Sequence, residues 1–192
     1  MKKTLLISIF ILISALSAQA NEIKRIFVGN ESAKISIIAF ESLTCSYCAK
    51  FHQDVYPLLK KEFLDTGLAK IEFRHFPLDI AAFNASKVAQ CKNDGNLEIL
   101  ESLYANQQKW VKGSSIEEAN INLQKFLSKE GFNIDFESCI NNKQIEDFVL
   151  NDRIDGAKNF KVNATPTIII NNEKFEKTLN YKNLKKALEK LI

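Results

Sequence analysis

Hydrophobic positions fall into short β-branched runs separated by longer stretches at helical spacing. Residues 35–41 (ISIIAFE) form a brief apolar run typical of a buried central strand. A helix is predicted next, bent at Pro57 and ending near Gly67. Its apolar positions are Phe51, Val55, Leu58, Leu59 and Phe63. In residues 69–76 the alternation directs Ile71 and Phe73 to one face, which predicts a second strand.

From residue 78 to about residue 155 the apolar spacing is helical throughout. Within this block Ser114–Ser115 with Glu117–Glu118 predicts a helix start, and Gly131 a helix end. The last helix of the block runs toward Phe160.

A third strand is expected in residues 165–170, and Asn171–Asn172 can turn it into residues 174–176. Leu184, Leu188 and Leu191 then mark a final amphipathic helix. The order is β-α-β, a helical block, then β-β-α. We therefore predict one α/β domain over residues 21–192, with a helical insertion at about 78–155.

The N-terminus has the three parts of a secretory signal peptide. Met1-Lys2-Lys3 is positively charged, residues 5–16 are apolar, and Ala18-Gln19-Ala20 is a small-residue cleavage site. The apolar run is shorter than the roughly 20 residues of a membrane-spanning helix. We expect residues 1–20 to be removed on export.

Composition excludes several classes of protein. The net charge is +3, and basic residues form no block after the first few positions, so we expect no nucleic-acid partner. Only 6 Gly and 3 Pro among 192 residues argue against a disordered or collagen-like chain. The 4 cysteines carry more information, because thiols in an oxidising compartment tend to form disulfides.

Cys45 and Cys48 lie in a Cys-Ser-Tyr-Cys motif where a strand ends and a helix begins. Unpaired backbone N–H groups and the helix dipole stabilise a thiolate there, so Cys45 is predicted to be the reactive sulfur. Cys48 lies one helical turn further on and can close a disulfide with it. A stabilised thiolate favours the reduced form, which makes that disulfide a stronger oxidant. The motif predicts a redox-active disulfide.

Other chemistries fit this motif less well. Zinc usually needs a second close ligand pair, and haem attachment needs a histidine at position 49, which is Ala. A purely structural disulfide across so short a loop gives little entropic benefit. A copper- or zinc-binding module using Cys45, Cys48 and His52 remains an alternative from a different class. His52 itself is interpreted as a polar residue on the helix surface, and we expect neither metal nor cofactor.

Cys91 and Cys139 both fall in the helical block, and export favours a structural disulfide between them over two buried thiols. Thr165-Pro166 begins a β-branched strand. A cis peptide there would turn the backbone of Thr165 toward the Cys45–Cys48 motif, where it could bind an extended substrate peptide.

The chain resembles the DsbA family of thiol:disulfide interchange proteins. The resemblance rests on FESLTCSYCAKFH (40–52), FRHFPLD (73–79), LYANQQKW (103–110) and NATPTIIIN (163–171), which together span nearly the whole mature chain. It implies a thioredoxin-like fold with an inserted helical subdomain. It also implies Cys45 as exposed nucleophile, Cys48 as buried partner and Pro166 as a cis-proline.

By the same resemblance, the protein introduces disulfides into reduced, cysteine-containing exported proteins and is reoxidised by a membrane partner of the DsbB type. One position departs from the family pattern. The usual buried acid six residues before the first Cys is replaced by Ala39. Glu41 would share the face of Ala39 on the strand, and we consider it as a substitute proton relay.

Isomerases and reductases of the DsbC and DsbG type share the Tyr of the motif and the Thr before the proline. They carry a substantial N-terminal dimerisation region, whereas only residues 21–34 precede the first expected strand here. A monomeric oxidase is therefore favoured, and isomerase activity stays open.

Overall fold

The computed structural model describes residues 22–192. The proposed signal peptide and its cleavage site lie outside the described residues. Within them, no helix combines the length and apolar character needed to cross a bilayer.

A five-stranded mixed sheet in the order β1-β3-β2-β4-β5 forms the centre of the fold. β2 and β3 are parallel, and the other neighbouring strands are antiparallel. The strands are β1 (Ile26–Gly29), β2 (Ile35–Glu41), β3 (Ala69–His75), β4 (Thr167–Ile170) and β5 (Glu173–Lys174).

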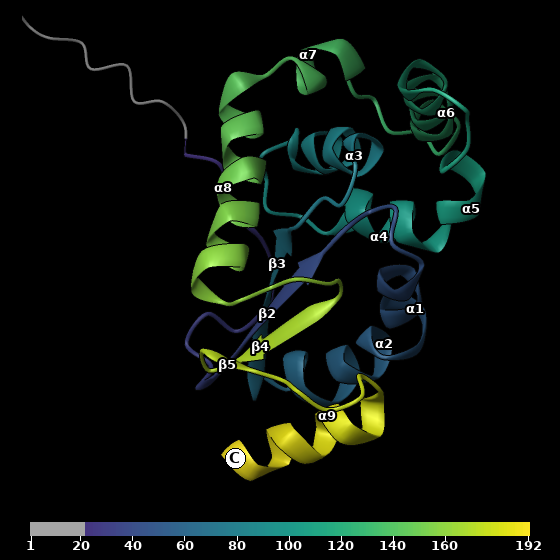
Figure 1. Ribbon diagram of the computed structural model, residues 1–192. Helices are drawn as coiled ribbons and strands as arrows, with labels where there is room; N and C mark the ends of the chain where they lie inside the picture. Colours follow the sequence, from purple (N-terminus) through teal and green to yellow (C-terminus); the bar gives the residue numbers. More distant parts are fainter. Residues whose placement is uncertain (1–21) are drawn as a thin grey trace, which may run out of the picture.

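Helices cover the sheet and fill the long connection between β3 and β4. The first group is α1 (Ser46–Asp54), α2 (Tyr56–Leu59) and a π-helical turn (Lys60–Leu64). The inserted helices are α3 (Ile80–Gln90), α4 (Glu98–Ala105), α5 (Gln107–Trp110), α6 (Ile116–Lys129), α7 (Phe136–Ile140) and α8 (Lys143–Asn159). After the sheet come α9 (Tyr181–Leu188) and a short 3-10 turn (Glu189–Leu191). Figure 1 shows the inserted helices grouped at one end of the molecule and α9 near the other.

The two faces of β2 enter different cores, because side chains alternate along a strand. Ile35, Ile37 and Ala39 belong to the main core, together with α1, α2 and α9 residues. Ile38 and Phe40 belong to a smaller cluster with Phe76, Val162 and Ile169. Glu41 has the parity of Ala39 and therefore points toward the side of α1.

α8 packs against β3, and its Gly156 lies against the ring of Phe40 from β2. A Cβ at this position would lie 2.8 Å from the ring of Phe40, so only glycine fits here without a shift of that ring. Trp110 is buried, and its indole N–H donates to the Leu103 carbonyl.

Most sequence-based element predictions are confirmed. Asn171 and Asn172 both adopt positive φ and turn β4 into β5. Ser115 caps α6 by accepting from the Glu118 N–H, and Gly131 follows its end with φ of 81°. The bend at Pro57 is a break: α1 ends at Asp54, and α2 begins with the proline in its first turn, where a missing N–H costs nothing.

Two expectations need correction. β1 was not predicted, because its four residues give too short a pattern. Leu58 is 41% exposed rather than part of the buried face. The last inserted helix, α8, ends at Asn159 and agrees with the helix expected to run toward Phe160.

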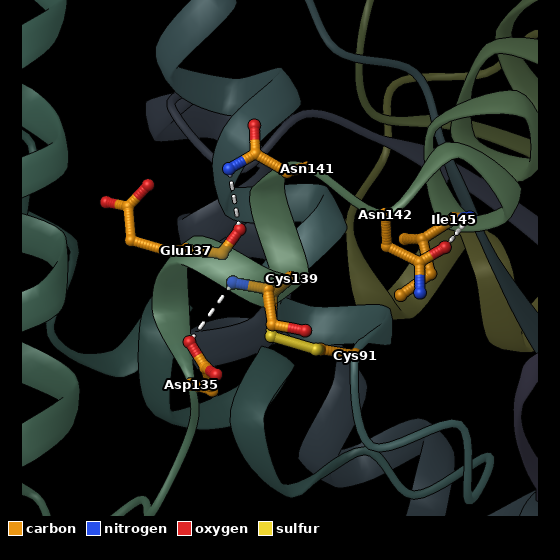
Figure 2. Close-up of a disulfide and its surroundings, with 8 residues drawn as sticks. Cys91, Asp135, Glu137, Cys139, Asn141, Asn142 and Ile145 are labelled. Atoms are coloured by element: carbon orange, nitrogen blue, oxygen red, sulfur yellow. Dashed lines mark hydrogen bonds between the residues drawn. A yellow bond between two sulfur atoms is a disulfide. The ribbon is translucent and has the colours of Figure 1, made fainter.

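A disulfide joins Cys91 and Cys139, as expected, with their Cα atoms 5.5 Å apart. It connects the end of α3 to α7 (Figure 2), so both ends belong to the helical insertion. Asp135 caps α7, the helix that contains Cys139, and Asn142 caps α8, which follows it. This disulfide is part of the packing of the insertion.

Candidate active site

Cys45 is the N-cap residue of α1, directly after the loop that leaves β2. Its extended backbone lets its carbonyl accept from the N–H groups of Cys48 and Ala49 at 3.1 and 3.2 Å. The side chain is half-buried, whereas neighbouring Tyr47 is 73% exposed. The sequence prediction that Cys45 stands at the start of a helix is confirmed.

The surroundings of Cys45 favour its thiolate. A hydrogen bond with the Cys48 thiol is the largest influence that lowers the pKa of Cys45 to about 5, although burial opposes it. The Thr165 side chain and the backbone N–H groups of Cys48 and Tyr47 lower this pKa further. At neutral pH Cys45 is therefore a thiolate, the form that exchanges with disulfides.

Cys48 has the opposite character, although it lies only three residues away. It is fully buried and unbonded in this structure, as a thiol beside Cys45. Burial raises the pKa of Cys48 far above its ordinary value, and the hydrogen bond to Cys45 and the charge of Glu41 raise it further. One sulfur of the motif is thus accessible and ionised, and the other is enclosed and protonated.

Thr165 and Pro166 approach this pair from the loop before β4. The Cys45 thiol lies 3.3 Å from the Thr165 carbonyl oxygen, to which it can donate. The peptide bond between Thr165 and Pro166 is cis. Residues 120 positions apart in the chain therefore meet at one sulfur.

A largely apolar groove of about 440 Å³ starts beside Thr165 and Pro166. Tyr47 and Phe51 of α1 line it, as does Leu179 from the segment before α9. The groove is linked to the reactive sulfur through Thr165, whose carbonyl contacts Cys45 Sγ.

Glu41 and His52 form a buried hydrogen-bonded pair beneath the motif. His52 Nε2 lies 2.9 and 3.1 Å from the two carboxylate oxygens of Glu41. Their side chains are 6% and 3% exposed, so the interpretation of His52 as a helix-surface residue is wrong. The periodicity misled because only apolar residues were used to mark the buried face, whereas the polar His52 also points inward, to Glu41 on the neighbouring strand.

Two further groups hold the active-site loop and were missed in the sequence. Gln107 of α5 donates to the carbonyls of Leu43 and Cys45, at 2.9 and 3.0 Å. Thr44 donates to Asp79, which also caps α3. Gln107 lies in one of the family-like blocks, yet nothing in its local pattern separates it from the exposed Gln108.

The geometry does not support a metal site at Cys45, Cys48 and His52. Among residues 22–192, no three side chains of the metal-binding types come together. His52 Nε2 is engaged by Glu41, which leaves the two sulfurs without a third ligand there.

Comparison with known proteins agrees with this geometry. A family profile described as Thioredoxin matches residues 21–190. Disulfide bond formation protein D of Bacillus subtilis is 26% identical over 174 residues, which cover 85% of this chain and 75% of that protein. A Rickettsia typhi protein whose name describes a protein-disulfide oxidoreductase is 25% identical, over 86% of this chain and 61% of its own length. The chain thus spans about three fifths of that relative.

Among solved structures, alpha-DsbA1 of Wolbachia pipientis superposes with a TM-score of 0.77. It is 27% identical, and the match covers 87% of this chain and 90% of that one. BdbD of Bacillus subtilis superposes with a TM-score of 0.71 at 22% identity, which shows the shared fold. The chain belongs to the thioredoxin family and has the fold of the DsbA proteins, with protein-disulfide oxidoreductases among its relatives.

Proposed function

We propose that this protein is a thiol:disulfide oxidoreductase that introduces disulfides into exported proteins through Cys45 and Cys48. The observation that carries the proposal is the contrast between the two sulfurs: a pKa of about 5 at Cys45, and a buried Cys48 whose pKa is raised. Because ionisation of Cys45 stabilises the reduced form of the protein, the Cys45–Cys48 disulfide is a stronger oxidant than a disulfide between two ordinary thiols.

The reaction consists of two thiol–disulfide exchanges. A substrate thiolate attacks Cys45 Sγ, the Cys45–Cys48 bond breaks, and its electron pair remains on Cys48. The substrate's second thiolate then attacks the mixed disulfide and releases Cys45 as a thiolate. The substrate is oxidised by two electrons, and the enzyme is left with both cysteines reduced.

Thr165 and Pro166 are the substrate-binding residues of this proposal. The Thr165 carbonyl already contacts Cys45, and the apolar groove beside it suits an extended peptide. Backbone contacts of this kind do not depend on side-chain identity, as an enzyme with many protein substrates requires.

Glu41 is proposed to relay the proton of Cys48, in place of the acid absent at Ala39. Its charge raises the pKa of Cys48, which supports a position close enough for proton exchange. Its burial on the α1 side of β2 is consistent with this role.

The signal-peptide pattern and the Cys91–Cys139 disulfide support an oxidising location, which we propose is the periplasm. Its partners would then be reduced cysteine-containing exported proteins and a membrane reoxidising protein of the DsbB type. We propose a monomer.

The test combines refolding of a reduced protein substrate with the redox potential of the Cys45–Cys48 pair. An oxidase should refold the substrate and show a potential well above the roughly −270 mV of thioredoxin. A potential at or below that value would identify a reductant instead. Faster recovery of a scrambled than of a reduced substrate would favour an isomerase.

A further inference from the structure

Proton transfer to Cys48 poses a problem that Glu41 alone does not solve. Cys48 is 0% exposed and Glu41 is 3% exposed, so both lie away from bulk water. Each exchange cycle forms a thiolate at Cys48 that needs a proton, and later removes that proton. A buried acid can pass one proton, but it must then recover it from the solvent.

His52 is placed to make that connection. Its Nε2 bonds to Glu41, and its Nδ1 is buried without any hydrogen-bond partner within residues 22–192. The Tyr56 hydroxyl beside it is likewise buried and unpartnered. An unpaired buried polar atom is costly and calls for an explanation such as a water or an exchanging proton.

Both residues line a cavity of about 520 Å³ between α1, α2 and α4. Exposed Gln53 and Glu101 also line it, which places it at the protein surface. It lies away from the groove at Thr165 and Pro166, and the two cavities share no lining residue. The titratable groups that contact His52 or line this cavity with it are Glu41, Tyr56, Lys60, Glu101 and Tyr104.

Aromatic rings surround the imidazole. Tyr104 stacks on it with ring centroids 4.2 Å apart and an interplanar angle of 19°. Tyr56 and Phe73 approach within 5.4 and 5.3 Å. Aromatic faces attract a cation, and the Glu41 carboxylate completes the surroundings that a transient imidazolium requires.

We propose that His52 carries protons between Glu41 and the solvent through this cavity, an inference that rests on the proposed function. When Cys48 leaves as a thiolate, the proton of His52 Nε2 passes through the Glu41 carboxylate to Cys48, and Glu41 is left ionised as before. His52 Nδ1 takes a proton from water in the cavity. When the enzyme is reoxidised, the Cys48 proton returns through the same atoms and Nδ1 releases one to water. The two half-reactions therefore restore the imidazole without rotating it.

The test is single-turnover oxidation of a reduced dithiol peptide by the disulfide form of the protein. His52→Gln keeps an N–H donor for Glu41 but cannot relay a proton, so the rate should fall by at least about tenfold at neutral pH. His52→Ala should be equally slow and regain rate as imidazole is added, because imidazole fits the vacated space. A wild-type rate in His52→Gln would overturn the proposal, as would a slow His52→Ala that imidazole does not accelerate.

His75→Gln is the matched control, since His75 is the chain's other histidine, is also buried, and bonds to Gln90. Imidazole should change neither the rate of His75→Gln nor that of the wild type. Acceleration of either protein by imidazole would overturn the inference. Ala105→Leu tests the route separately, because Ala105 is exposed, lines the cavity, and would narrow it as leucine while Glu41 and His52 are unchanged. It should slow the reaction with the pair intact, and an unchanged rate would overturn the cavity as the route.

Failure of this inference can be told from failure of the proposed function. If the wild-type disulfide form does not oxidise the peptide, the proposed function fails. If the wild type reacts and the His52 variants match it, only the relay through His52 fails.

Discussion

The two cysteine pairs of this chain have the same side chains but lie in different surroundings. Cys45 and Cys48 are three positions apart, unbonded here, and differ strongly in burial and pKa. Cys91 and Cys139 are 48 positions apart and bonded within the helical insertion. The first pair differs from the second because it lies at a helix N-terminus, beside the buried acid Glu41 and the Thr165 carbonyl. The difference shows that neighbouring groups, rather than the presence of two cysteines, decide whether a disulfide exchanges or only crosslinks.

Removal of Cys45 should have the largest effect on this contrast. Cys45→Ser should lower the rate of peptide oxidation by at least about a thousandfold, as loss of an activated nucleophile does in other enzymes. The measurement is oxidation of a dithiol peptide at neutral pH. Cys139→Ser is the control and should keep most of the rate; equal losses in both would erase the distinction between the pairs.

Removal of the Cys91–Cys139 disulfide should affect stability and spare the chemistry. The double variant Cys91→Ala/Cys139→Ala frees a loop of 48 positions, which by chain entropy costs about 4 kcal/mol. Denaturant unfolding measures the free energy, and the peptide assay under folding conditions measures the activity. Unchanged stability would contradict a structural role for this disulfide.

Gln107 links the two regions, since it lies in the insertion and bonds to the active-site loop. Gln107→Leu should lower the free energy of unfolding by about 2 kcal/mol, because the buried Leu43 carbonyl loses its side-chain donor and the Cys45 carbonyl loses one of three donors. The exposed neighbour gives the matched control, and Gln108→Leu should stay within about 0.5 kcal/mol. Similar values for both would mean that the loop does not depend on this donor.

The smallest expected effect is that of pH on the rate at which Cys45 is alkylated. With a pKa of about 5, Cys45 is already ionised at pH 7, so its alkylation rate should change little as pH rises further. An ordinary thiol would react about tenfold faster per pH unit below its pKa. The alkylation rate is measured by mass spectrometry of the alkylated protein. A steep rise of this rate between pH 7 and 8 would contradict the assignment.

The same pKa predicts how pH affects the stability of the reduced protein. The pKa of Cys45 is lower in the folded protein than its ordinary value of 9.0. The thiolate therefore stabilises the fold fully above that value, and this contribution decreases as pH falls and is lost below about 5. Reduced wild type should lose stability relative to reduced Cys45→Ser over that range, as measured by denaturant unfolding.

Much of the fold was predictable because local patterns agreed with the global arrangement. The β-branched runs of β2 and β4, the Asn171–Asn172 turn and the Ser115 cap each carry a local physical signal. The position of Cys45 followed from a strand directly before a helix. β1 escaped prediction, because its pairing with β3 is a tertiary contact that four residues do not encode.

The supporting groups of the site were less predictable. The face of Glu41 followed from the two-residue period of β2, but its bond to His52 depends on how α1 packs over the strand. Gln107 acts across 62 positions of sequence and has no local signature. Sequence patterns locate the reactive sulfur well, whereas the groups that reach it from other elements emerge only when the chain is folded.

The hydrogen bonds of Gln107 also limit how the protein can be shortened. In Figure 1 the inserted helices other than α8, which packs on β3, group at one end of the molecule, and a shortened chain could be made without them. Such a truncated chain would lack Gln107, the side-chain donor to the Leu43 carbonyl and one of three donors to the Cys45 carbonyl. A minimised version would therefore need a replacement donor at this turn before its nucleophile could be held in place.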